Sequence, residues 1–106
     1  MKILVLGDVM GVSGRNALNQ KLPQLIIKNQ IDFVVVNGEN SADDGKGITR
    51  DIAEEFFKIG VDVITSGNHI WDKMETIEYI NKENRLLRPA NLVEGSPGKG
   101  HEIFFS

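Results

Sequence analysis

The sequence predicts an α/β fold in which a mainly parallel sheet, built from βα units, is flanked by helices. Three short runs of apolar, mostly branched residues end in glycine or polar residues; they are 3–6, 31–36 and 61–66. Strands that are buried on both faces of a parallel sheet have this composition. The segments between the runs have helical periodicity, and alternating strands and helices give parallel strands joined by right-handed crossovers.

The first two strands, 3–6 and 31–36, are expected to be joined by a loop and a helix. Residues 11–14 (Gly-Val-Ser-Gly) predict the loop. Apolar side chains then recur at helical spacing over residues 15–29, which predicts the helix. Pro23 interrupts this segment, so we expect a kink or two short helical pieces.

A polar, glycine-containing loop at 41–47 is expected to lead into a second helix. Thr49 has the position of an N-cap and Gly60 that of a C-terminal stop. The inward face of this helix would carry Ile52, Phe56, Phe57 and Ile59.

A third strand over 61–66 is expected to precede a third helix. Asp72 and Glu75 have the spacing of a capping box. The apolar side of this helix would consist of Met74, Ile77 and Ile80. Later segments are expected to be loops (88–91 and 95–100), followed by the start of a fourth strand (103–105).

Composition restricts the class of protein. A chain of 106 residues is expected to form a single domain, residues 1–106. The net charge of −3 comes with no basic stripe, which argues against binding nucleic acid through its phosphates. The absence of cysteine excludes disulfides and thiolate metal ligands. The first apolar run is too short for a signal peptide or a membrane span, so we expect a cytoplasmic protein.

Metal-type ligands follow all three predicted strands, at the edge where ligands bind in parallel sheets. Asp8 follows the first strand and can bind a divalent cation or cap a turn. Glu39 and Asn40 follow the second; Glu39 can bridge two cations, whereas in a dinucleotide-binding fold it would bind a ribose. Asn68 and His69 follow the third, where the histidine can bind a metal, donate a proton or serve only as a structural hydrogen-bonding group.

Taken together, these motifs resemble those of the calcineurin-like metallophosphoesterases, and within them the YmdB-like bacterial phosphodiesterases. The resemblance extends over nearly the whole chain, with the motifs in the same order. It rests on Gly-Asp-Val-x-Gly-x-x-Gly-Arg (7–15), Asn-Gly-Glu-Asn (37–40), Gly-Lys-Gly (45–47), Gly-Asn-His-x-Trp-Asp-Lys (67–73), Arg-Pro-Ala-Asn (88–91) and Pro-Gly-Lys-Gly (97–100).

The resemblance implies the N-terminal half of a metallophosphoesterase-like layered fold with two divalent metal ions, iron or manganese. Asp8, Glu39 and Asn40 would hold the first ion, with Glu39 as the bridge, and Asn68 would bind the second. His69 would protonate the leaving oxygen or stabilise phosphoryl charge. The implied substrate is a cyclic nucleotide or another small phosphodiester, cleaved by a water that the two metals activate.

One departure from the family pattern concerns the histidines. The family takes further histidine ligands from later strand ends, but His101 is the only histidine after His69 and matches none of them. We therefore expect an incomplete domain with weak metal binding and little activity alone, completed by another chain or self-associating through open sheet edges. The alternatives are a nucleotide-binding module, with Glu39 on the ribose and the 11–14 loop on phosphate, and a degenerate half-domain with an assembly role.

Overall fold

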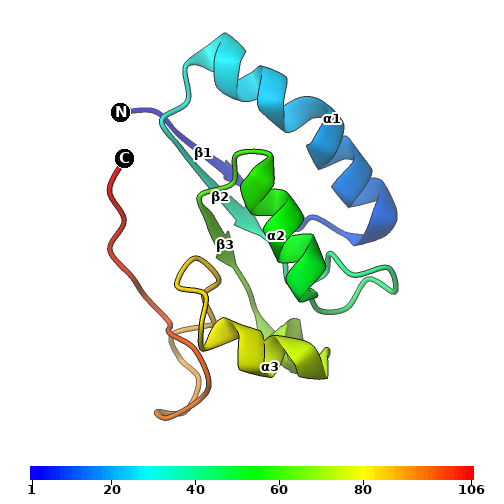
Figure 1. Ribbon diagram of the computed structural model, residues 1–106, viewed down its shortest axis with the longest axis vertical. Coiled ribbons are helices and arrows are strands. Elements are labelled where there is room, and N and C mark those ends of the chain that lie inside the picture. Colours follow the sequence, from blue (N-terminus) through cyan, green and yellow to red (C-terminus); the bar gives the residue numbers. More distant parts are fainter.

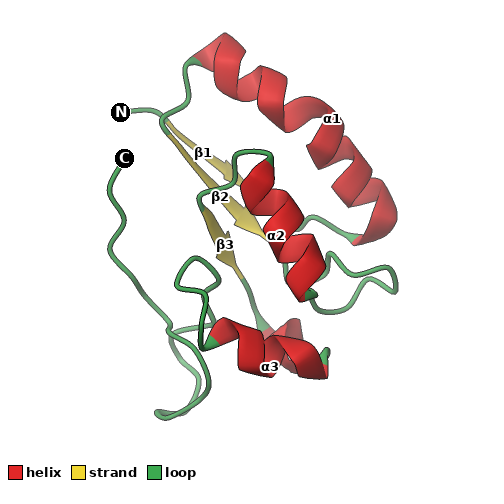
Figure 2. Ribbon diagram, viewed as in Figure 1, coloured by secondary structure: helices red, strands yellow, loops and turns green.

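The computed structural model describes residues 1–106 and has the predicted α/β architecture, with helices packed against a parallel sheet (Figures 1 and 2). The elements follow in the order β1 (Ile3–Leu6), α1 (Gly11–Asn29), β2 (Phe33–Asn37), α2 (Arg50–Lys58), β3 (Val63–Thr65), the 3-10 helix η1 (Asn68–Trp71) and α3 (Met74–Ile80). The sheet has the order β1-β2-β3, and both neighbouring pairs are parallel.

The core lies between the sheet and the helices α1 and α2. Val34 and Val36 of the central strand are buried against Leu18 and Leu22 of α1 and Phe56 of α2. All of these belong to one cluster of 15 buried residues, which also reaches η1, α3 and the chain after α3. A single core therefore positions every strand end at which a site residue was predicted.

Helix α1 differs from the prediction in two ways. It begins at Gly11 rather than after the glycines, because the 11–14 stretch is its first turn and not a loop. It also continues through Pro23 as one helix rather than as two helical pieces. Leu18 and Leu22, both buried, hold the helix against the core before the proline, while Pro23 itself is exposed.

Strand β1 is not buried on both faces as predicted. It is an edge strand, and the side chains of Ile3 and Val5 are 55% and 68% exposed, whereas Leu4 and Leu6 pack against the core. An edge strand with an apolar outer face favours pairing with another chain. The expected self-association stays a prediction.

Helix α2 has the predicted cap, but α3 does not. Thr49 accepts a hydrogen bond from the backbone N–H of Ile52 at 3.2 Å. In α3 the N-cap residue is Lys73, without a side-chain cap, and Glu75 instead accepts from the N–H of Arg50 at 3.1 Å. The predicted apolar side is also wrong in part, because its buried residues are Thr76 and Ile80, while Met74 is exposed.

The fourth position in the sheet is occupied by a different segment from the one predicted. Leu86 forms a parallel bridge with Ile64 of β3. Residues 103–105 have no strand pairing, and Phe104 packs against Phe33 with ring centroids 6.0 Å apart. Leu86 is fully buried, but it lies in a segment without apolar periodicity. The sequence pattern therefore predicted the fourth strand at the more apolar run, residues 103–105. No helix combines the length and apolar character that crossing a membrane requires.

Candidate metal centre at the carboxyl edge of the sheet

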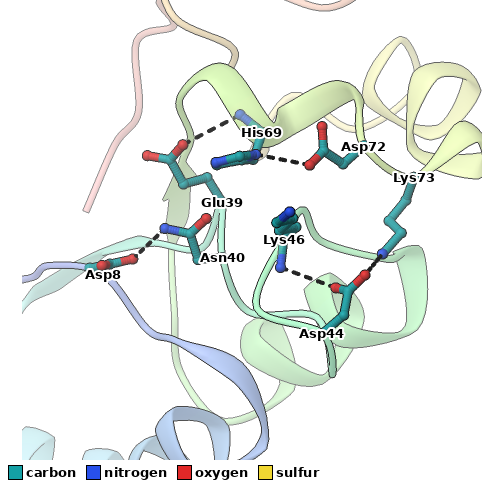
Figure 3. Close-up of polar contacts among 8 residues, drawn as sticks. All are labelled: Asp8, Glu39, Asn40, Asp44, Lys46, His69, Asp72 and Lys73. Atoms are coloured by element: carbon teal, nitrogen blue, oxygen red, sulfur yellow. Dashed lines mark hydrogen bonds and ion pairs between the residues drawn. The ribbon is translucent and has the colours of Figure 1, made fainter.

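Asp8 and Asn40 lie in contact beyond the carboxyl ends of β1 and β2. The N–H of Val9 donates to the carbonyl of Asn37 at 3.1 Å, which ties the two strand ends together. The Nδ2 of Asn40 donates to Oδ1 of Asp8 at 2.8 Å (Figure 3). Asp8 has a φ of 37°, a left-handed conformation that aspartate tolerates better than most residues and that is often found at functional sites.

Glu39 lies across the next strand end, against Gly67. A Cβ atom at residue 67 would be 2.3 Å from both carboxylate oxygens of Glu39, so only glycine leaves room for this carboxylate. The backbone N–H of His69 also faces Oε2 of Glu39, at 3.5 Å, which is a long hydrogen bond (Figure 3). Residues after β2 and β3 are thus packed directly against each other.

His69 is held by a carboxylate that sequence reasoning assigned to another role. Its Nδ1 lies 2.8 Å from Oδ2 of Asp72, which was predicted to cap α3. Both side chains are about one-third exposed. The spacing of three residues within a helical turn is the signal that could have revealed this pair.

Asn68 is exposed at the start of η1 and its side chain makes no hydrogen bond within the chain. The structure therefore places all five predicted residues at one edge of the sheet, and brings Asp8 to Asn40 and Glu39 to the turn that contains His69. No three histidine, cysteine, aspartate or glutamate side chains are grouped so that they could hold a metal ion.

The 41–47 loop is fastened beside this edge by two ion pairs. Arg15 of α1 lies 2.8 Å from Asp43. Lys73 lies 2.8 Å from Asp44, as Figure 3 shows. The hydrogen bond from Lys73, aided by the backbone N–H of Lys46, holds the pKa of Asp44 below its usual value. Both pairs are partly exposed, so each adds little stability by itself, but together they fix the loop to two elements.

The close contact between this loop and η1 depends on Gly47. Its φ is +81°, and a Cβ there would lie 3.2 Å from the carbonyl oxygen of His69 and 3.3 Å from Cβ of Asp72. The 41–47 loop therefore packs against the backbone at His69 and supports it.

The largest cavity does not coincide with these residues. It has a volume of about 670 Å³ and lies between α2 and α3, lined mainly by acidic side chains with Tyr79. Burial and the neighbouring Glu54 raise the pKa of Tyr79 well above its usual value. None of the candidate site residues lines this cavity. The candidate centre is therefore identified by the ligand types of its side chains and not by the size of a cavity.

Comparison with known proteins identifies the family. The sequence pattern described as YmdB-like protein matches residues 4–106. The chain is 46% identical over 100 residues to the 2′,3′-cyclic-nucleotide 2′-phosphodiesterase of Bacillus subtilis (strain 168), with 94% of this chain and 38% of that protein covered. It is 33% identical over 108 residues to a putative phosphatase/phosphodiesterase of Mycoplasma genitalium, and the match covers 98% of this chain and 38% of that protein.

Two solved structures share the fold. A novel phosphatase from Mycoplasma pneumoniae matches with a TM-score of 0.89 at 39% identity, over 100% of this chain and 39% of that one. A hypothetical protein from Thermus thermophilus matches with a TM-score of 0.85 at 39% identity, over 94% and 38%. The chain spans 38% of the length of both curated relatives described above. On the match over residues 4–106, the chain belongs to the YmdB-like protein family.

Proposed function

We propose that this chain supplies part of the metal centre and the proton donor of a metal-dependent phosphodiesterase acting on cyclic nucleotides or similar small phosphodiesters. The observation that carries the proposal is the contact between Asp8 and Asn40, beside a Glu39 carboxylate that is seated on Gly67. The names of the relatives, phosphodiesterase and phosphatase, support the reaction class.

The residues at this edge fit divalent cations. Asn40 uses its amide nitrogen on Asp8, which leaves its carbonyl oxygen available as a ligand. Glu39 lies in a space that any side chain at residue 67 would fill. Carboxylate and amide oxygens, with an imidazole nearby and no cysteine in the chain, suit manganese or iron better than metals that prefer thiolates.

Asp8, Glu39 and Asn40 would hold one ion and Asn68 a second, with Glu39 between them. Two such ions supply an activated water and neutralise phosphoryl charge. Octahedral cations need more ligands than these four side chains offer. We therefore infer that the chain alone binds metal weakly and turns over little substrate.

His69 would act on the leaving oxygen. Because the carboxylate of Asp72 can only accept, Nδ1 of His69 carries the hydrogen of their 2.8 Å contact. Nε2 is then the ring atom that faces the substrate. It would give a proton to the leaving oxygen from the imidazolium, in which both ring nitrogens carry hydrogen, and Asp72 fixes the direction in which it points. The packing of Gly47 on the His69 carbonyl limits movement of this turn.

Metal titration tests the proposal. We expect the wild-type chain to bind Mn²⁺, followed by electron paramagnetic resonance, and Asp8→Ala to weaken that binding at least about tenfold because it removes a charged ligand. Asp51→Ala is the matched control, since it removes an exposed aspartate on α2, outside the site.

Two results would count against the proposal. Equal Mn²⁺ affinity in the wild-type and Asp8→Ala chains would place the metal elsewhere. Binding of a cyclic nucleotide that is unchanged by EDTA would favour a nucleotide-binding module without hydrolysis. Rapid hydrolysis of bis(p-nitrophenyl) phosphate by the chain alone would contradict the inferred weakness of its metal centre.

A further inference from the structure

A fourth strand end opens at the same edge of the sheet. The N–H of Ile64 donates to the carbonyl of Arg85 at 2.7 Å, and the N–H of Leu87 donates to the carbonyl of Ile64 at 2.9 Å. With the parallel bridge at Leu86, these bonds make 85–87 run beside β3 in the same direction. Figure 1 shows the chain after α3 returning to this position. Arg88 therefore lies just beyond the carboxyl end of the segment 85–87. Asp8 and Asn68 have the same position relative to β1 and β3.

The guanidinium of Arg88 is incompletely paired. Its Nη1 donates to the carbonyl of Pro89 at 3.0 Å, while Nε is buried and has no hydrogen-bond partner. Arg15 and Arg85, by contrast, are each paired with a carboxylate. A buried donor without a partner is rare in folded proteins. Nη2 also has no partner in the chain but is not buried, so it is the donor that a ligand can reach.

The chain around Arg88 forms a cavity of about 310 Å³, enough for a phosphate group. Its wall is two tightly packed loops: the N–H of Arg88 donates to the carbonyl of Lys99 at 2.9 Å, and a Cβ at Gly100 would lie 2.5 Å from Cα of Ala90. These loops are the Arg-Pro-Ala-Asn and Pro-Gly-Lys-Gly motifs, for which the proposed metal centre has no use.

Arg88 is the positively charged group of the cavity that forms no ion pair. Lys99 and His101 also line it, and Glu94 is its one carboxylate. The ammonium of Lys99 is engaged with Glu102 at 3.1 Å, so the unpaired positive charge is that of Arg88. Nη2 is the guanidinium donor that is neither buried nor hydrogen-bonded, and a guanidinium N–H forms a strong, charge-assisted hydrogen bond to a phosphoryl oxygen.

We propose that Arg88 binds a phosphoryl oxyanion through its guanidinium, with Nη2 as the donor that faces the ligand, beside the candidate metal centre. The identity of the ligand, a phosphoryl group of the substrate or of the product, rests on the proposed function. The site itself is formed without any metal ligand, so it can be examined with the metal removed.

The test follows the backbone N–H resonances of Ala90 and Gly100, which line the cavity in every variant, by NMR in EDTA while inorganic phosphate or dimethyl phosphate is added. Both anions present phosphoryl oxygens, so a response to either one supports the site. A response to inorganic phosphate alone indicates that the site binds a product-like phosphate, and a response to dimethyl phosphate alone indicates that it binds a diester. We expect a saturable shift, and about tenfold weaker binding in Arg88→Gln because a charge-assisted hydrogen bond is lost. Arg88→Lys should recover part of the affinity, since it keeps the charge but not the fork.

Arg50→Gln is the charge-matched control, because Arg50 lies exposed on α2 and forms no ion pair. It should bind both anions as the wild type does. If Arg88→Gln fails to fold by circular dichroism, the comparison rests on Arg88→Lys. No saturable shift of the cavity resonances with either anion, or equal losses in the Arg88 and Arg50 variants, would overturn the site. That outcome leaves the Mn²⁺ titration of Asp8 unaffected, so the two proposals fail separately.

Discussion

At the scale of single residues, Gly67 is the position where substitution should separate folding from function. Both carboxylate oxygens of Glu39 lie 2.3 Å from the place of a Cβ atom at this residue. Such a contact is resolved only by moving one of the two groups, and the Glu39 side chain is the movable one. The residue that would bridge the metals is therefore positioned by the absence of a side chain on a neighbouring strand end.

Gly67→Ala is expected to weaken Mn²⁺ binding because the added methyl group displaces Glu39. The cost in unfolding free energy should stay within about 1–3 kcal/mol, as for other overpacked sites. Gly7→Ala is the matched control, since a Cβ at the end of β1 would meet no atom within 4 Å. Mn²⁺ titration and urea unfolding of both variants check this, and unchanged metal affinity in Gly67→Ala would contradict it.

The sequence predicted the site residues individually but not all of their partners. Asp8, Glu39, Asn40, Asn68 and His69 were chosen as candidates because each follows an apolar run, and the parallel register brings the ends of those runs to one edge of the sheet. The partner of His69 could not be predicted, because Asp72 can face either a helix N-terminus or an imidazole. The intervening 3-10 turn, which periodicity does not reveal, decides between them.

At the scale of elements, the turn after α3 is fixed by an arginine with two partners. Arg85 donates from Nε and Nη2 to the two carboxylate oxygens of Glu83, at 2.9 and 2.7 Å. Its guanidinium also lies 3.9 Å from the ring centroid of Phe57 on α2. The turn therefore joins α2 to the segment that ends in Arg88.

The pair predicts an acid-sensitive contribution to stability. The hydrogen bonds from Arg85 hold the pKa of Glu83 below its ordinary value of 4.5, with burial opposing them. A carboxyl with a lowered folded-state pKa contributes stability that is present above the unfolded pKa and lost as pH falls through the folded one. Glu83→Gln should thus cost about 0.5–1 kcal/mol near neutral pH.

Urea unfolding of the wild type and Glu83→Gln at neutral and at strongly acidic pH measures this contribution. The difference between the two proteins should shrink in acid, where Glu83 is protonated in both folded and unfolded states. Glu78→Gln serves as the control, because its ion pair with Lys82 is long, at 3.5 Å, and largely exposed. A difference for Glu83→Gln that does not vary with pH would refute the assignment.

Elements were predicted where local pattern and tertiary packing agree. Strand β1 and the Thr49 cap of α2 are of this kind, because an apolar run and a cap hydrogen bond are local features. The unbroken helix α1 and the fourth strand position at Leu86 were not predicted, because there the local pattern and the packing disagree. In both, packing of leucines against the core outweighs a local signal, a proline in one case and a stronger apolar run in the other.

At the scale of the whole molecule, one core cluster joins all the elements, and Phe56 lies fully buried within it. Phe56→Ala should lower the unfolding free energy by about 3–5 kcal/mol, the range for removing a buried ring. Domains of this size have only about 5–15 kcal/mol in total. Metal binding should therefore weaken together with folding, although Phe56 is not itself a site residue.

Phe105→Ala is the matched control, since this ring is 92% exposed. It should leave the urea midpoint nearly unchanged. The two variants are compared by urea unfolding monitored by circular dichroism. Similar losses in both would mean that the terminal segment, rather than the α2 contact, carries the stability of the core.

The order of the sheet also has a consequence for how the protein is made. Neighbours in the sheet are neighbours in the chain, from β1 through β2 and β3 to the segment at Leu86, so each strand is added at the same growing edge. Because the N-terminal part of a chain leaves the ribosome first, β1 and β2 can pair before β3 has been synthesised. Asp8 and Asn40 can then meet before the segment that ends in Asn68 and His69 is translated. During translation, the centre would form in the same order in which its residues are encoded.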